Sequence, residues 1–162
     1  MSKDILYIYN FQKDYLFNVL NNVSDEIAYQ KQLEGFNSAG WIMGHLCAEG
    51  IDVMNKMSIE NPCTINWGEI FSYNSKKLES IHELPTLTEA KNDFSKIYDI
   101  LIDRFLNLTE KEKDSPAPSV LLEDILPNLS SWYIHHLTTH ISVHIGNIVV
   151  WKKMLGLEIN GY

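Results

Sequence analysis

Residues 86–108 read TLTEAKNDFSKIYDILIDRFLNL and carry the clearest helical period in the chain. Thr86, followed three residues later by Glu89, has the spacing of a capping box, which marks the start of a helix. Apolar residues then recur at intervals of three and four, as in an amphipathic helix with one buried face: Leu87, Ala90, Phe94, Ile97, Leu101, Phe105 and Leu108. Such a face must pack against other elements of the fold.

Three other segments show the same period. The first spans residues 4–21, the second runs from 38 to 57, and the third runs from about 128 to 155, where Gly156 is placed to end it. No segment shows convincing strand-like alternation. Four long amphipathic helices predict an all-α fold, a four-helix bundle.

The connection between the helix expected at residues 38–57 and the helix expected at residues 86–108 is unusually long. It covers residues 58–85 and contains the aromatic residues Trp67, Phe71 and Tyr73. A connection of this length can carry the chain back along the bundle, so that the two helices it joins run parallel. We expect its aromatic side chains to pack across the side or mouth of the bundle.

Composition narrows the kind of protein. The 162 residues suit a single domain over residues 1–162, and the net charge of −8 with no basic stripe argues against a nucleic-acid partner. No stretch has the length of a signal peptide's apolar core or of a membrane span, which predicts a cytoplasmic protein with no membrane partner. Cys47 and Cys63 match no metal or redox spacing, and we expect Cys47 to be buried.

Histidines gather in the last predicted helix. Its inward stripe reads Leu129, Trp132, His136, His140, Val143 or His144, Asn147 and Trp151. A stripe that served packing alone would be apolar, because each buried imidazole without partners costs roughly 1–3 kcal/mol. His140 and His144 lie one turn apart, so their ring nitrogens can reach one metal ion. The alternative is that these histidines are hydrogen-bonded core residues.

A third ligand can come from His45 on the second predicted helix. Three neutral imidazoles that leave coordination positions open are typical of a catalytic site. His136 and His144 are eight residues apart, roughly 12 Å along a helix, and cannot share one ion. The spacing leaves two pairs open, His136 with His140 or His140 with His144.

Three motifs resemble the DinB-like family. They are Ser24-Asp-Glu-Ile-Ala28, Phe36-Asn-Ser-Ala-Gly-Trp41-Ile-Met-Gly44-His45-Leu46, and His140-x-x-x-His144-x-Gly146-x-Ile148. The resemblance covers most of the chain, including the long aromatic crossover. It implies that His45, His140 and His144 bind a divalent ion such as zinc or nickel. It also implies an up-down-down-up bundle and a homodimer.

The resemblance also implies a range of activities. Members of the family include S-transferases that use bacillithiol, mycothiol or glutathione, together with thiol-dependent isomerases and hydrolases. Two residues depart from the family's commonest form: Asn147 stands where Gln often follows the glycine, and Ile145 stands where Arg is common. These departures leave the three histidines untouched but bear on any shared substrate contact.

We therefore expect a metal-dependent enzyme that acts on a small-molecule substrate, with a thiol as cosubstrate. Glu49 and His136 are candidate proton acceptors, and Asn147 is a candidate ligand contact. Glu49 could instead orient His45, act as a fourth ligand or face solvent, and His136 could be a core residue. The alternatives for the whole chain are a metal-dependent hydrolase and a non-catalytic metal- or ligand-binding dimeric module in stress or regulation. Trp151 and Tyr162 are candidates for a dimer contact.

Overall fold

The structure is a computed structural model that describes residues 2–31, 33–72, 83–118 and 124–159. Within these ranges all regular secondary structure is helical, and the only strand-like pairing is an isolated bridge between Pro116 and Asn128. The expected all-α class is confirmed.

The helices occur in the order α1 (Ser2–Val19), α2 (Asp25–Ala28), α3 (Ala39–Lys56), α4 (Trp67–Phe71), α5 (Leu87–Leu106), α6 (Glu110–Lys113), α7 (Leu129–Ile134), the π-helix η3 (His135–Thr139) and α8 (His140–Met154). The four long helical segments expected from the sequence are present, each with its ends within two residues of the expected positions. The last of them differs in kind, because a π-helix interrupts it between α7 and α8.

The helix ends follow the capping signals of the sequence. Thr86 and Glu89 form both hydrogen bonds of a capping box at the start of α5, and the Ser38 hydroxyl accepts a hydrogen bond from the Trp41 N–H at the start of α3. Gly156 follows Leu155, the residue that caps the C-terminus of α8. Its φ is +68°, a left-handed conformation that favours glycine. Local sequence therefore fixes where three of the long helices begin or end.

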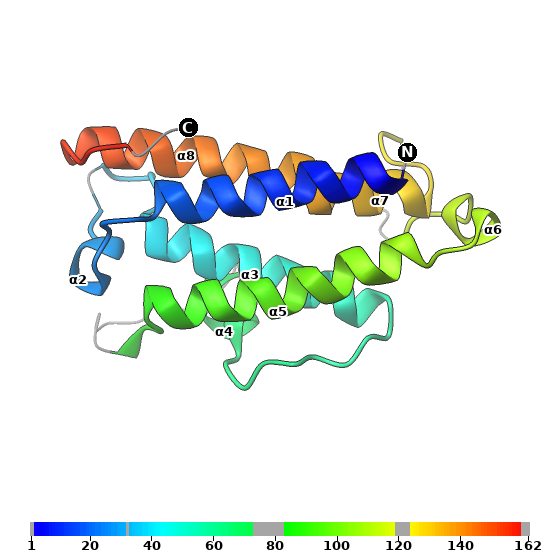
Figure 1. The fold of residues 1–162 in the computed structure, drawn as a ribbon. Helices are drawn as coiled ribbons and strands as arrows, with labels where there is room; N and C mark the ends of the chain where they lie inside the picture. The colour runs from blue at the N-terminus through cyan, green and yellow to red at the C-terminus, as the bar shows by residue number, and fades with distance from the viewer. Residues whose placement is uncertain (1, 32, 73–82, 119–123, 160–162) are drawn as a thin grey trace.

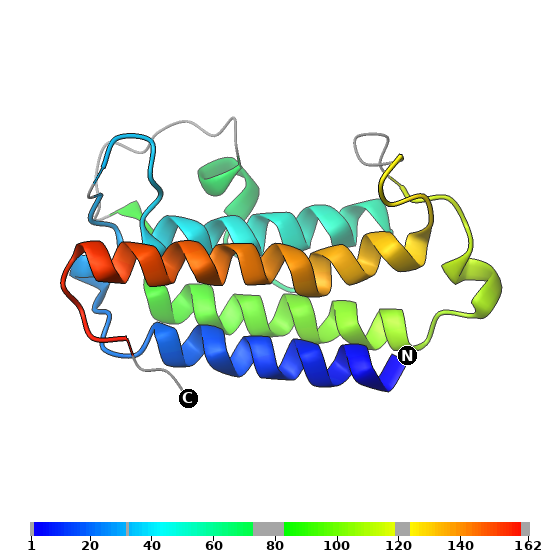
Figure 2. The ribbon, with the colours of Figure 1, turned by 90° about the horizontal axis from the view of Figure 1, so that it is seen from above.

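Helices α1, α3, α5 and α8 lie side by side along the length of the molecule (Figures 1 and 2). α1 packs against α8 and α5, and α3 packs against the other side of the same two helices. α3 and α5 begin at the same end of the molecule, whereas α1 and the α7–η3–α8 segment begin at the opposite end (Figure 1). This arrangement places α3 beside α8, with the two helices running in opposite directions.

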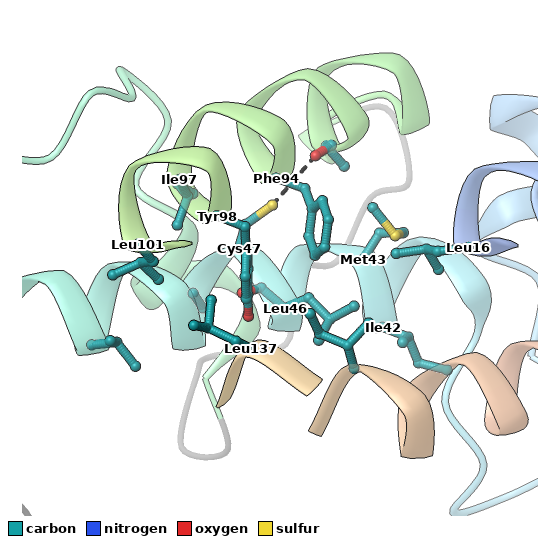
Figure 3. Packing of buried hydrophobic residues seen from close by; sticks show 14 of the residues in the cluster. Leu16, Ile42, Met43, Leu46, Cys47, Phe94, Ile97, Tyr98, Leu101 and Leu137 are labelled. Carbon is teal, nitrogen blue, oxygen red and sulfur yellow. Dashed lines mark hydrogen bonds between the residues drawn. The ribbon is translucent and has the colours of Figure 1, made fainter. Parts of the chain in front are cut away.

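The core lies between these helices and is built from their apolar faces. Figure 3 shows part of it, where side chains from α3 and α5 interdigitate with Leu16 of α1 and Leu137 of η3. The most deeply buried residues include Leu46, Cys47, Phe94 and Leu101, all with no exposed surface. Burial of side chains of this size stabilises the fold by about 1.5–3 kcal/mol each. Cys47 is a free thiol in this core, as expected.

The long crossover packs against the helices through α4. Trp67 and Phe71 are buried, which confirms the expectation for these two aromatic residues, while Tyr73 lies outside the described residues. α4 contacts α3, which carries one of the candidate ligands. None of the helices in the described ranges combines the length and the apolar character that crossing a bilayer requires.

Candidate metal centre

His140 and His144 lie on the first two turns of α8, and their rings face each other. The Nε2 atoms of the two rings are 3.1 Å apart, and the ring planes stand nearly perpendicular, at 84°. Two imidazole nitrogens that bind one zinc ion tetrahedrally are separated by roughly 3.3 Å, given bonds of about 2.0–2.1 Å. The pair therefore already has the spacing of two ligands to one ion.

His45 completes the group from α3. Its side chain is only 2% exposed, and its ring centroid lies 5.6 Å from that of His140 and 5.0 Å from that of His144. One possible ligand atom of each histidine lies within 4.8 Å of those of the other two. The three histidines are therefore close enough to bind one metal ion.

Two of these rings, those of His140 and His144, are held in the form that binds metal. Burial and the neighbouring His144 lower the pKa of His140 to about 3, and burial together with His45 lowers the pKa of His144 to about 4. Both rings are neutral at pH 7, and only a neutral imidazole has a lone pair to offer a metal ion.

Hydrogen bonding supports the fit of a cation. The Nδ1 atom of His45 lies 3.2 Å from the carbonyl oxygen of Phe71, so this ring carries its proton on Nδ1 and its lone pair on Nε2. Among the residues that the structure describes, the Nδ1 atoms of His140 and His144 are buried and have no hydrogen-bond partner, while their Nε2 atoms converge. A cation between the Nε2 atoms of His140 and His144 would accept the lone pairs of both, which repel each other at 3.1 Å when neither nitrogen carries a proton.

The expected inward stripe of the last helix is displaced. The fully buried positions of α8 are Ile141, Ile148, Trp151 and Lys152, of which only Trp151 belongs to the expected stripe. His140 and His144 are half-buried and Val143 is exposed. The stripe assumed a continuous α-helical period, but η3 inserts a wider turn before α8 and rotates the residues that follow. The histidines thus flank the core, where a ligand can reach them.

The π-helix also brings in a histidine that sequence reasoning missed. His135, which is not among the candidate residues of the sequence, is half-buried, and its ring lies 6.0 Å from that of His140. Residues five apart in an α-helix are separated by roughly 140° around the axis, and the wider π-helical turn reduces this angle. No local sequence signal identifies this π-helix.

The other candidate residues lie on α3, η3 and α8. His136 is half-buried, and its ring lies 4.8 Å from that of Trp132 and 5.9 Å from that of His140. Glu49 is half-buried on the turn after His45. Burial lowers the pKa of His135, and the charge of Glu49 offsets part of this lowering. Neither residue belongs to the group close enough to share an ion. Asn147 is half-buried on α8, and its role stays a prediction.

Of two tryptophans considered in the sequence, Trp41 lies at the site and Trp151 lies in the core. Trp41 stacks on the His45 ring, with the ring centroids 5.0 Å apart and the planes at 12°, so it lines the site. Trp151 is fully buried and donates a hydrogen bond from Nε1 to the carbonyl oxygen of Gln30. It is therefore not available for a dimer contact, and Tyr162 lies outside the described residues.

Comparisons with known proteins define the fold and leave the activity open. The chain is similar to the crystal structure of a protein from Streptococcus pneumoniae determined by a structural genomics consortium. The TM-score is 0.64 with 12% sequence identity, over 95% of this chain and 91% of that one. No family model matches the chain, and no curated protein matches it. The likeness at this identity establishes a shared all-α fold.

Proposed function

We propose that the chain is a divalent-metal-dependent enzyme of the DinB-like family, with the up-down-down-up four-helix bundle of that family. The observation that carries the proposal is the convergence of His45, His140 and His144 from two helices. The arrangement of α1, α3, α5 and α8 and the order of the motifs along the chain support the family assignment.

The donor set favours a particular class of metal. Three neutral imidazoles suit zinc or nickel better than the hard ions magnesium and calcium, which take oxygen ligands. His45, His140 and His144 would hold the ion, and three ligands leave positions open for a substrate. Such an ion lowers the pKa of a bound thiol or water, which becomes a nucleophile near neutral pH.

We infer that the reaction is a thiol-dependent S-transfer. The sulfur of a low-molecular-weight thiol forms a bond to an electrophilic carbon of a small-molecule substrate, the bond from that carbon to its leaving group breaks, and the thiol proton passes to a base on the protein. Glu49, half-buried one turn after His45, is the candidate base that the experiment below tests. His136, whose pKa burial lowers to about 4, is the alternative.

The transferase is tested with tag-free protein loaded with zinc or nickel, an activated electrophile and a panel of thiols including bacillithiol, mycothiol and glutathione. We expect thiol consumption that depends on metal, is lost in His140→Ala, and falls about 100-fold or more in Glu49→Gln at unchanged metal affinity. No metal-dependent rate with any thiol would exclude the transferase. Ester or amide hydrolysis by the same loaded protein would then indicate a hydrolase, and tight metal binding without turnover would indicate a binding module.

We also propose that the protein is a homodimer. Val143, Val150 and Met154 are exposed apolar residues of α8, and their spacing of seven and four residues places them on one face of the helix. On α1, Tyr7 is 70% exposed and Ile8 is 44% exposed. Both border an apolar groove of about 590 Å³ between α1 and α8. Exposed apolar surface of this kind favours association with a second copy.

A further inference from the structure

The His45 ring is oriented by a backbone group of the crossover. Its Nδ1 donates to the carbonyl oxygen of Phe71, the last residue of α4, at 3.2 Å. A histidine that binds metal through one nitrogen needs an acceptor for the proton on the other, because this bond fixes both the tautomer and the direction of the ring. Phe71 lies 26 residues from His45 in sequence, so α4 must be held in place for the bond to form.

Gly44 allows α4 to approach α3 this closely. It is buried in α3 next to His45, and a Cβ atom at this position would lie within 3.0 Å of three atoms of the Phe71 ring. Real Cβ atoms do not approach a ring so closely, so any larger residue would push Phe71 away. A glycine inside a helix costs about 1 kcal/mol relative to alanine. At Gly44 this cost is offset by the close packing of the Phe71 ring against α3.

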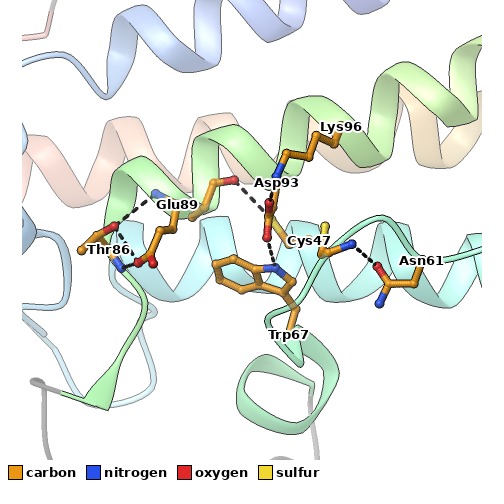
Figure 4. A network of polar contacts seen from close by, with 9 residues as sticks. Cys47, Asn61, Trp67, Thr86, Glu89, Asp93 and Lys96 are labelled. Carbon is orange, nitrogen blue, oxygen red and sulfur yellow. Dashed lines mark hydrogen bonds and ion pairs between the residues drawn. The ribbon is translucent and has the colours of Figure 1, made fainter.

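The other end of α4 is fixed to α5. Trp67, the first residue of α4, is fully buried and donates from Nε1 to the Oδ2 atom of Asp93 at 3.0 Å (Figure 4). Asp93 is 6% exposed, and its Oδ1 atom accepts from the Lys96 ammonium group at 2.8 Å. Since Asp93 is satisfied on both oxygens, the bond to Trp67 has a single defined geometry.

We infer that α4 is the positioning element of the metal centre. The Trp67–Asp93 hydrogen bond and the contact of Phe71 with Gly44 fix the Phe71 carbonyl group, and this carbonyl group holds His45 with its Nε2 lone pair toward His140 and His144. The long crossover thus has a function besides connecting α3 to α5. This inference rests on the proposed metal site and adds residues that lie outside its ligand set.

The test compares two matched pairs of variants. Gly44→Ala fills the space that Phe71 occupies, whereas Gly68→Ala changes α4 itself at a position where a Cβ meets nothing within 4 Å. Asp93→Leu removes the hydrogen-bond acceptor for Trp67, whereas Asp93→Asn keeps a side chain of the same shape with one acceptor oxygen. Zinc affinity is measured by competition with a chromophoric chelator, and the His45 tautomer is read from ring ¹⁵N chemical shifts of the metal-free protein.

We expect Gly44→Ala and Asp93→Leu to lower zinc affinity about 10- to 100-fold, while Gly68→Ala and Asp93→Asn stay within about threefold of wild type. His45 should be protonated on Nδ1 in the wild type and in both controls, and should become a mixture of tautomers in the other two. Should Gly44→Ala fail to fold, the Asp93 pair decides. Equal affinity across all four folded variants would overturn the inference but leave the metal site standing, whereas a wild type that binds no zinc would refute the site itself.

Discussion

The Nε2 atoms of His140 and His144 lie 3.1 Å apart on successive turns of α8. In a protein without metal, one of these nitrogens must donate a proton to the other or the two lone pairs repel. A divalent cation removes this conflict because it accepts both lone pairs, and the His45 lone pair with them. A shared cation would also account for the half-buried positions of His140 and His144 beside a largely apolar core.

The metal-free protein should lose stability as the pH falls from about 6.5 to about 5. His136, His140 and His144 have folded-state pKa values of about 4, 3 and 4, below the value of about 6.5 in an unfolded chain. In this window the unfolded chain binds more protons than the folded one, so lowering the pH favours unfolding, by at most about 1.4 kcal/mol per pH unit for each group. Urea unfolding between pH 5 and pH 7 measures this slope.

The variant His136→Gln is the control for the pH effect, because it removes one titrating ring without removing a proposed metal ligand. Its slope should be smaller than that of the wild type by up to about 1.4 kcal/mol per pH unit. A wild-type free energy of unfolding that is constant over this range would show that the histidines are not held neutral by the fold.

Zinc should stabilise the folded protein. At a free zinc concentration 100 times the dissociation constant, the gain is about 2.7 kcal/mol, or roughly 5–10 °C in Tm for a domain of this size. His144→Ala should abolish the shift, while His135→Ala should keep most of it because His135 lies outside the group that can share an ion. Differential scanning calorimetry with and without zinc makes the comparison, and equal shifts in the two variants would argue against His144 as a ligand.

The capping box of α5 gives a test of stability away from the site. The Thr86 N–H donates to the Glu89 carboxylate at 2.7 Å, and the Glu89 N–H donates to the Thr86 hydroxyl at 3.1 Å. Thr86→Ala should lower the free energy of unfolding by about 1 kcal/mol. Thr88→Ala, at an exposed position inside the same helix, should leave it unchanged or raise it slightly. The two variants are compared by urea unfolding, and an equal loss in both would rule out the cap as the cause.

The dimer proposal predicts a defined effect of charge on α8. Val150 is 42% exposed and lies between Val143 and Met154 on the same face. Val150→Asp should shift the protein from dimer to monomer in sedimentation equilibrium, while zinc affinity stays the same. A monomeric wild type at micromolar concentration would refute the homodimer.

The sequence predicted the long helices and the three converging histidines well, for physical reasons. Apolar periodicity and caps such as Thr86 with Glu89 act locally, so they can be recognised without the fold. The spacing of His140 and His144 is likewise a property of one helix, but it equally allows His136 with His140, and only the family resemblance favours the pair His140 and His144. The choice of His45 as their partner came from its place on a second helix and from the family resemblance, and the structure brings all three within reach of one ion.

What the sequence could not predict depends on tertiary packing. The π-helix η3 has no local signal, and it moves Ile141 and Ile148 into the core and His135 toward His140. The contact between Phe71 and His45 involves a backbone carbonyl group, which every residue type carries. Gly44 belongs to the motif that contains His45, but its close contact with the Phe71 ring depends on how α4 packs against α3.

The metal content of protein purified without a histidine tag tests the central claim most directly. Inductively coupled plasma mass spectrometry should find about one zinc or nickel ion per chain, either as isolated or after incubation with the metal and removal of the excess. His45→Ala, His140→Ala and His144→Ala should each lose it. A folded wild type that retains no stoichiometric metal, or alanine variants that retain it fully, would contradict the account.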